Sequence, residues 1–319
     1  MIPLEWIQEA GQRIKPYVRL TPLVYDPELD IYIKWENQQT TGSFKLRGAI
    51  NKVLTLQSWE RERGLVAASA GNHGQGLALA GQFVGASVTI FASEHAVPQK
   101  IAAMQELGAI VKLIPGGYAD AEQAAIAYAQ LNGSTWVSPY NDGQVIAGQG
   151  TLAFEILSEL PPRQHPTWLT PVGGGGLAAG ILTVLASLHP RPSLVGVQSI
   201  ASPFFHALFH RSTQANVVEL SSLADGLSGP VEDGSVTIPI LHAGLNDLIL
   251  VTEEEIGQAI AFAWTKYGQR IEGSAAVTLA AVLSGKIIDH PAVLIISGGN
   301  IQTEVFEQLV QQYGSNDHS

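Results

Sequence analysis

The stretch "TPVGGGGLAAG" (170–180) places four consecutive glycines between an apolar strand-like run and an alanine-rich, helix-like segment. Glycine lets successive backbone N–H groups approach an anion closely, and the first turn of the following helix adds its positive dipole end. A tight turn without a ligand would need fewer glycines, so we predict a phosphate site here. The absence of Walker A and GxGxxG spacing disfavours an NTPase or a dinucleotide site.

The same alternation of strand and helix runs through most of the chain. Because strands that alternate with helices of this length form crossover units, the pattern predicts an α/β protein with buried strands in parallel sheets. The segment 210–246 lacks clear periodicity and is expected to wrap the surface or the site. The predicted strands are 31–35, 64–69, 87–92, 109–114, 135–138, 167–172, 193–198 and 292–297, and the clearest helices are 73–85, 118–133 and 176–189.

Composition limits the classes of function. The 319 residues are 46% hydrophobic and carry a formal net charge of -11, so a nucleic-acid or anionic-membrane partner is disfavoured. There is no cysteine, which excludes disulfides and thiolate chemistry. The N-terminus does not resemble a secretory signal, and no apolar run reaches the roughly 20 residues of a membrane span. We expect a soluble, cytoplasmic protein of two domains.

One lysine stands in a setting suited to covalent chemistry. In "TGSFKLRGA" (41–49), Lys45 follows an aromatic ring and a Gly-Ser turn. A Schiff-base lysine needs a lowered pKa and a fixed position, for which Phe44 and the turn would supply desolvation and Arg47 a nearby cation. A solvated surface charge is the usual role of a single lysine, so this motif alone leaves both interpretations open.

Two further loops carry polar side chains at strand ends. In "ASAGNHGQGLALA" (68–80), Ser69, Asn72 and His73 either cap a helix or hold a carboxylate or a cofactor hydroxyl. In "SGGN" (297–300), Ser297 either caps the last helix or offers a hydroxyl to a ring nitrogen in the crevice at the carboxyl ends of the strands.

Two other patterns are interpreted as parts of the structure and not as functional sites. "HALFH" places His206 and His210 one helical turn apart, but no third ligand is evident, so no metal site is predicted. "TEEEI" (252–256) is typical of an acidic helix start with Thr252 as its cap.

Taken in order, the motifs resemble the serine/threonine dehydratase and serine racemase group of pyridoxal-5′-phosphate enzymes, which have fold type II. Besides the loops above, "LADGLSG" and "IEGSAAVTLAA" match, so the resemblance spans residues 41 to 300. It implies two open twisted sheets flanked by helices. It also implies a small domain of 64–141 that receives the substrate carboxylate, inserted into a large cofactor-binding domain of 1–63 and 142–319.

The resemblance assigns a role to each matching position. Lys45 would form the internal aldimine and act as the catalytic base, and Phe44 would pack near the cofactor. Asn72 would bind the 3′-oxygen, Ser297 would face the pyridine nitrogen, and Gly226 would lie against the other cofactor face. The phosphate loop would be Gly173, Gly174, Gly175 and Gly176, and the carboxylate loop would be Ser69, Ala70, Gly71, Asn72 and His73.

The implied reaction is the dehydrative deamination of L-threonine, L-serine or a related β-hydroxy amino acid. Racemases of the group carry a serine where this chain has Ala70, so racemisation is disfavoured. The stretch "GVQSIASPFF" (196–205) lacks the carboxylates that bind a divalent cation in some relatives, so no metal is expected. β-Replacing and threonine synthase-like relatives usually read "SFKDR" and "SGNTG", unlike this chain. A binding protein that had lost catalysis would be expected to lack Lys45 or Ser297.

Two further expectations follow from the resemblance. Relatives are commonly dimers or tetramers, so a homodimer or homotetramer acting on a small amino acid is expected. Only 19 residues follow "SGGN", too few for the regulatory module of biosynthetic threonine dehydratases, so control by isoleucine is not expected.

Overall fold

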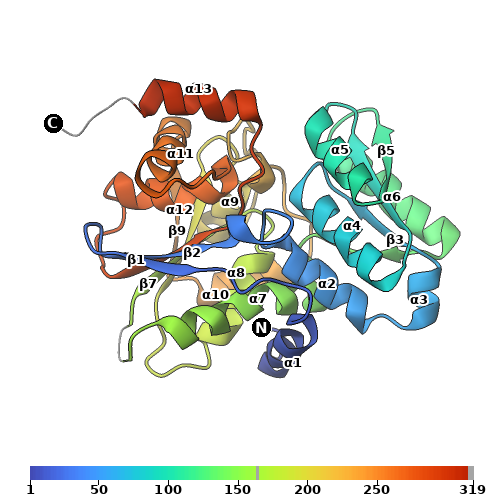
Figure 1. The fold of residues 1–319 in the computed structure, drawn as a ribbon, viewed down its shortest axis with the longest axis horizontal. Coiled ribbons are helices and arrows are strands. Elements are labelled where there is room, and N and C mark those ends of the chain that lie inside the picture. The colour runs from blue at the N-terminus through green and yellow to red at the C-terminus, as the bar shows by residue number, and fades with distance from the viewer. Residues whose placement is uncertain (163–164, 315–319) are drawn as a thin grey trace.

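Two separate β-sheets, each flanked by helices, organise the chain (Figure 1). The structure, a computed structural model, describes residues 1–162 and 165–314. The larger sheet has the order β1 (Leu23–Asp26), β2 (Ile31–Trp35), β10 (Ala292–Ile296), β7 (Thr167–Pro171), β8 (Leu194–Ser199) and β9 (Asp247–Val251). The smaller sheet has the order β5 (Ile110–Ile114), β4 (Val88–Ser93), β3 (Leu65–Ala68) and β6 (Thr135–Trp136). The predicted α/β class is confirmed.

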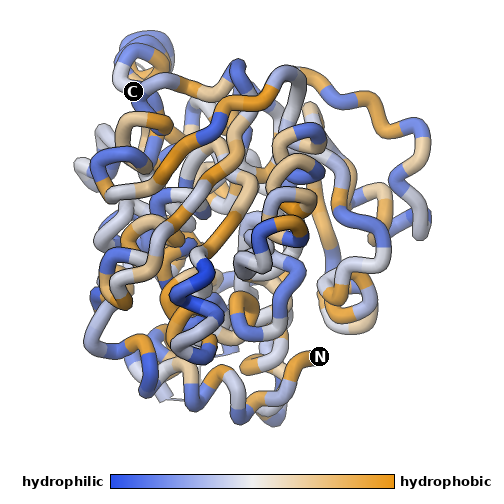
Figure 2. Tube along the Cα trace, turned by 90° about the vertical axis from the view of Figure 1, so that its right-hand side faces the viewer, coloured by the Kyte–Doolittle hydropathy of each residue, from blue (hydrophilic) through white to orange (hydrophobic). Residues whose placement is uncertain are grey.

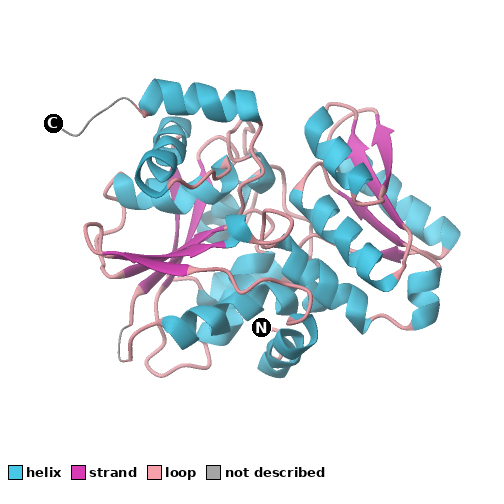
Figure 3. Cartoon of the chain, viewed as in Figure 1, coloured by secondary structure: helices cyan, strands magenta, loops and turns pink. Residues whose placement is uncertain are grey.

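Helices cover the sheets and connect their strands (Figure 3). The first part of the chain contains α1 (Leu4–Ile14), η1 (Glu36–Gln38), α2 (Lys45–Thr55), α3 (Ser58–Glu62), α4 (Asn72–Val84), α5 (Pro98–Glu106) and α6 (Tyr118–Asn132). The rest contains α7 (Gly143–Glu159), α8 (Gly176–Leu185), α9 (Phe204–Arg211), η2 (Asp225–Leu227), α10 (Thr237–Gly244), α11 (Glu253–Tyr267), α12 (Gly273–Leu283) and α13 (Thr303–Tyr313). In the part of the chain described, no helix has the length and apolarity of a membrane span.

Burial explains why these segments form strands and helices. Every residue of β2 and of β10 is buried, as the covering of both sheet faces requires. One hydrophobic cluster lies between the larger sheet and α7 and α8, and another lies between that sheet and α11 and α12. In Figure 2 many helices alternate between polar and apolar segments, as helices with one face on a sheet do.

Glycines at helix crossings fix α2 and α8 relative to each other. A Cβ atom on Gly148 of α7 would collide with the backbone of Arg47, and one on Gly150 would lie 2.9 Å from the carbonyl oxygen of Gly180. Backbone therefore touches backbone where α7 crosses α2 and where it crosses α8. This contact matters for function because α2 begins at Lys45 and α8 begins in the tetraglycine loop.

Several sequence expectations are corrected. β1 runs antiparallel to β2, so the larger sheet is mixed rather than parallel. β5 was expected to be buried but is an edge strand with two exposed residues. The sequence did not predict β1 or β9, and the segment 210–246 contains η2 and α10. Thr252 caps α11 as predicted, accepting a hydrogen bond from the Glu255 N–H.

Candidate active site

Lys45 lies beside the carboxyl end of β10. The backbone N–H of Phe44 donates to the carbonyl oxygen of Ser297 at 3.0 Å, and Ser43 forms a bridge with Gly298. These contacts attach the start of α2 to the "SGGN" loop. The Lys45 ammonium donates to the carbonyl oxygen of Pro139 at 3.0 Å and lies 5.2 Å from the centre of the Phe44 ring. The structure thus brings Phe44, Lys45 and Ser297 together.

The Lys45 side chain loses its proton more readily than an ordinary lysine does. Burial lowers the pKa of Lys45 to about 8, although the nearby Glu272 carboxylate acts in the opposite direction. Arg47 does not provide the cation that the sequence suggested. Its guanidinium is fully buried and ion-paired with Glu36 at 2.8 Å and with Glu155 at 2.6 Å. Desolvation, not a neighbouring cation, therefore lowers the pKa of Lys45.

The tetraglycine loop fits an anion. None of the backbone N–H groups from Gly173 to Gly176 donates a hydrogen bond within the described residues, and the loop leads into the N-terminus of α8. A Cβ atom on Gly174 would overlap the Tyr140 ring. A Cβ atom on Gly173 would lie 3.4 Å from the carbonyl oxygen of Gly226. The loop is therefore fixed in place by its neighbours while its donors stay free, as a phosphate cradle requires.

Asn72 is the centre of a polar network that the sequence did not predict. Its side-chain oxygen accepts from the Asn300 amide at 2.7 Å, and its amide donates to Glu272 at 2.6 Å. These two contacts fix which side of the Asn72 amide carries the donors. Glu272 belongs to the motif "IEGSAAVTLAA", which matched the family as a whole, but the carboxylate itself was not singled out.

Glu272 combines deep burial with an unusual proton affinity. Only 4% of its surface is exposed. Burial, with a smaller effect of Asp225, raises the pKa of Glu272 to about 7, while Lys100 and the Asn72 hydrogen bond oppose the rise. A carboxyl group with a pKa near neutral thus contacts Asn72 and acts electrostatically on Lys45.

The Ser69–His73 loop offers backbone donors rather than a charged imidazole. The Ser69 hydroxyl accepts from the N–H groups of Gly71 and Gly74 at 3.1 and 3.0 Å, which organises the start of α4. His73 Nε2 lies 2.9 Å from the carbonyl oxygen of Val137. Burial, together with the charge of Lys45, lowers the pKa of His73 to about 3, so this side chain is neutral. Ala70 is exposed beside them.

Ser297 follows β10 and carries a hydroxyl without a partner among the described residues. The residue is 3% exposed, and its hydroxyl forms no hydrogen bond with any part of the chain that the structure describes. It does not cap the last helix, because α13 begins at Thr303 with Gln302 at the N-cap. The interpretation of Ser297 as a helix cap is therefore wrong.

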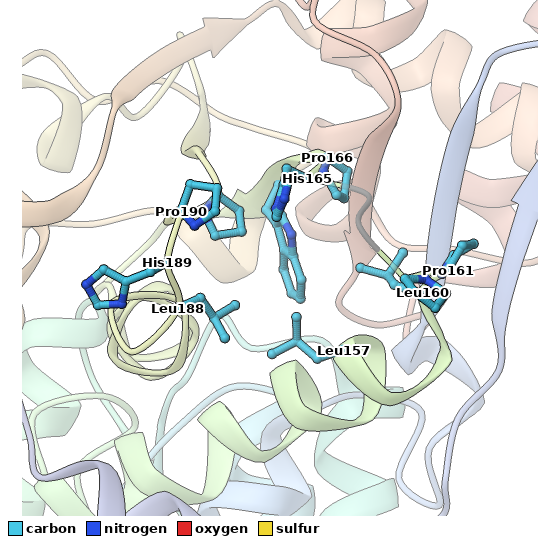
Figure 4. Close-up of a pocket in the computed structure, with 11 residues that line it drawn as sticks. Leu157, Leu160, Pro161, His165, Pro166, Leu188, His189 and Pro190 are labelled. Carbon is cyan, nitrogen blue, oxygen red and sulfur yellow. The ribbon is translucent and has the colours of Figure 1, made fainter.

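Two other features lie apart from these residues. The rings of His206 and His210 are 4.3 Å apart, but no group of three potential metal ligands occurs in residues 1–162 and 165–314. A hollow of about 230 Å³ includes His165, Pro166 and His189 (Figure 4). It lies at the start of β7, whereas the tetraglycine loop follows the end of that strand, where ligands of open α/β sheets bind.

The pKa of Lys45 predicts how the protein reacts with an aldehyde such as pyridoxal phosphate, the cofactor that the sequence resemblance implies. Because only the neutral amine attacks, the rate of pyridoxal phosphate attachment should rise about tenfold between pH 6 and 7 and level off above about pH 8. Nα-acetyl-lysine should keep rising to about pH 10.4. Glu272→Gln should move the midpoint of the protein to lower pH, because it removes a charge that favours the ammonium. Stopped-flow absorbance measures these rates, and a midpoint near that of free lysine would contradict the prediction.

Comparisons with known proteins agree with this arrangement. Residues 11–298 match the pyridoxal-phosphate dependent enzyme family. The L-threonine ammonia-lyase of Thermotoga maritima is 39% identical over 319 residues, which is 98% of this chain and 79% of that protein. The processed form of threonine deaminase isoform 2 from Solanum lycopersicum has a TM-score of 0.87 at 29% identity, covering 98% of this chain and 93% of that one. Maize serine racemase has a TM-score of 0.88 at 26% identity, covering 98% of each chain.

The chain therefore belongs to the pyridoxal-phosphate dependent enzyme family. Its two sheets and flanking helices are those of fold type II, and the predicted cofactor is confirmed as pyridoxal 5′-phosphate. The free N–H groups of the tetraglycine loop and the desolvated Lys45 amine are chemically suited to that cofactor's phosphate and aldehyde.

Proposed function

We propose that this enzyme is an ammonia-lyase that converts L-threonine, L-serine or a related β-hydroxy amino acid into a 2-oxo acid and ammonia. The observation that carries the proposal is the Lys45 amine, which is desolvated and held beside the "SGGN" loop at the start of α2. Helix α7 packs against both α2 and α8, and so fixes Lys45 relative to the helix that follows the tetraglycine loop. The similarity to an L-threonine ammonia-lyase and to a threonine deaminase supports threonine as the substrate.

Each site residue has a defined task in this reaction. Pyridoxal phosphate, when bound, supplies the electron sink that makes the α-proton acidic. Lys45 Nζ removes that proton, and the β-hydroxyl leaves as water, which is taken up again when ammonia is released. The N–H groups of Gly173 to Gly176 hold the phosphate, with Gly226 packed against them. Asn72 would donate to the 3′-oxygen. Ser297 would offer the ring nitrogen a hydroxyl that is too weakly acidic to protonate it fully.

The Ser69–His73 loop receives the substrate carboxylate in this proposal. Asn72 and His73 are the first two residues of α4, and their backbone N–H groups donate to no acceptor within the described residues, so both are free to bind a ligand. We further propose that 64–141 forms the small domain and 1–63 with 142–319 the large one. The enzyme is proposed to be a cytoplasmic homodimer or homotetramer that needs no metal ion.

A racemase is the alternative that a specific comparison favours, because maize serine racemase superposes closely. Racemisation needs a second proton donor on the face of the substrate opposite Lys45. Ala70 has no transferable proton at the position where racemases of the group carry serine. β-Replacement also remains an alternative, although Leu46 replaces the aspartate usual in those relatives.

The holoenzyme should release 2-oxo acid from L-threonine or L-serine without any added thiol or phosphate ester. We expect the rate of D-amino acid formation, measured by chiral chromatography in the same mixtures, to be small by comparison. Initial rates over a panel of β-hydroxy amino acids then identify the preferred side chain. Turnover only in the presence of a thiol, or D-isomer formation faster than 2-oxo acid release, would overturn the proposal.

A further inference from the structure

An ion pair directly beside the site joins helix α5, next to the smaller sheet, to the short helix η2, next to the larger sheet. Lys100 lies in the first turn of α5, and its ammonium is 2.5 Å from a carboxylate oxygen of Asp225 in η2. The Lys100 side chain is only 15% exposed, although it is charged. Asp225 immediately precedes Gly226, which packs against the tetraglycine loop. The pair therefore connects the region of the smaller sheet to the proposed cofactor site.

Lys100 also lies across the loop proposed to receive the substrate carboxylate. A Cβ atom on Gly71 would lie 3.5 Å from the Lys100 Cδ and 3.9 Å from its Nζ. The charge of Lys100 additionally acts on Glu272, which is hydrogen-bonded to Asn72. The contacts with Gly71 and Asp225 thus place the ammonium beside the Ser69–His73 loop, and its charge acts on Glu272.

Helix stability does not explain a lysine at this position. The N-terminus of a helix carries a partial positive charge, so a cation in the first turn of α5 is electrostatically unfavourable. Burying most of the side chain adds a desolvation cost. Lys100 is held there by contacts outside its own helix, which indicates a role in the site.

The other basic side chains near the loop are unsuited to pairing with a carboxylate. His73 is neutral, because its pKa is lowered to about 3. Lys45 is committed to the cofactor in the proposed function. The Arg47 guanidinium is enclosed by Glu36 and Glu155. Lys100 remains as a charged donor whose present partner, Asp225, is more than half exposed and can be replaced by a ligand.

We propose that Lys100 is a substrate-binding residue: its ammonium, paired with Asp225 in the free enzyme, binds the α-carboxylate of the amino acid. This inference rests on the proposed function for the orientation of the substrate. The carboxylate receives backbone N–H groups from the Ser69–His73 loop on one side and the Lys100 ammonium on the other. Lys100 thereby selects α-amino acids over amines or amides with the same side chain.

The test separates binding from turnover. L-2-Aminobutyrate has the carbon skeleton of threonine but lacks the hydroxyl that leaves, and L-2-aminobutanamide lacks the carboxylate charge as well. Their dissociation constants are measured from the change in cofactor absorbance of the holoenzyme. The wild type should prefer the acid, and Lys100→Met should weaken binding of the acid about 10- to 100-fold while leaving the amide nearly unchanged.

Asp225→Asn distinguishes substrate binding from a purely structural ion pair. If Lys100 binds the substrate, removing the charge of Asp225 frees its ammonium, so Asp225→Asn should leave the dissociation constant of the acid unchanged or lower it. If the ion pair only stabilises the structure, Asp225→Asn and Lys100→Met should weaken binding of the acid equally. Lys286→Met is the matched control, because Lys286 forms a comparable pair with Glu255 away from the site. It should change neither constant.

Four outcomes are informative. Equal weakening of acid and amide by Lys100→Met, or equal losses in Lys100→Met and Asp225→Asn, would overturn the assignment of Lys100. A wild-type enzyme with no preference for the acid would also overturn it. Absence of 2-oxo acid release, with the acid preference and its loss in Lys100→Met intact, would overturn the proposed lyase reaction and leave the Lys100 inference standing.

Discussion

Replacing Lys45 with alanine should lower the rate of 2-oxo acid release from L-threonine by about 10⁴-fold. In the proposed reaction the variant loses both the amine that would hold the cofactor covalently and the base that would remove the α-proton. Adding pyridoxal phosphate should not restore the rate, because the tetraglycine loop can still bind the phosphate but no base remains. Initial rates at saturating substrate and cofactor measure the effect.

Lys52→Ala is the matched control for this variant. Lys52 lies on the same helix, α2, and pairs with Asp142 instead of reaching the site. It should retain both turnover and covalent attachment. Borohydride reduction followed by peptide mapping should label Lys45 in the control and no lysine in Lys45→Ala. Turnover close to wild type in Lys45→Ala, or a label on another lysine, would refute the assigned chemistry.

Some of the site was predictable because its chemistry is contained in contiguous residues. The tetraglycine run supplies its backbone donors within four residues, and the "SFK" motif places the lysine at a helix start, although distant segments complete the burial of its amine. Glu272 and Lys100 were missed for the opposite reason. Glu272 meets Asn72, 200 residues away, and Lys100 meets Asp225, 125 residues away. Neither side chain is unusual in its own segment, so only the tertiary structure identifies it.

Arg47 shows that closeness in sequence can also suggest the wrong interaction. Its position two residues after Lys45 suggested an electrostatic effect on the amine. Its actual partners, Glu36 and Glu155, are 11 and 108 residues distant in sequence and surround the guanidinium. Sequence proximity therefore gave the wrong partner, although the prediction of a desolvated lysine agrees with the lowered pKa.

In the fold, too, some strands were predictable from the sequence and others were not. β2 was predicted to its residue limits because buried strands are rich in β-branched and aromatic residues, although this strand also buries Lys34. β1 was missed because it is a four-residue edge strand with one buried residue, so its sequence lacks that run. β5 has the apolar residues typical of a central strand but lies at the edge of its sheet. Pairing of β10 with β2 joins opposite ends of the chain, which local periodicity does not reveal.

The second large effect is expected from Gly174→Val in the tetraglycine loop. A Cβ atom at this position would overlap the Tyr140 ring, and valine adds two further carbons. The loop must then move, and its N–H groups lose their common orientation toward the phosphate. Affinity for pyridoxal phosphate should fall by at least about 100-fold. Equilibrium dialysis of the cofactor against the apoprotein measures the loss directly.

Two further variants test whether the steric clash with Tyr140 causes the loss of cofactor affinity. Gly11→Val serves as the control, because a Cβ atom on Gly11 of α1 would meet no atom within 4 Å. It should bind the cofactor like the wild type. Adding Tyr140→Ala to Gly174→Val removes the ring that valine strikes and should recover part of the affinity. Wild-type affinity in Gly174→Val would mean that the phosphate does not depend on this loop, and the proposed cofactor site would have to be placed elsewhere.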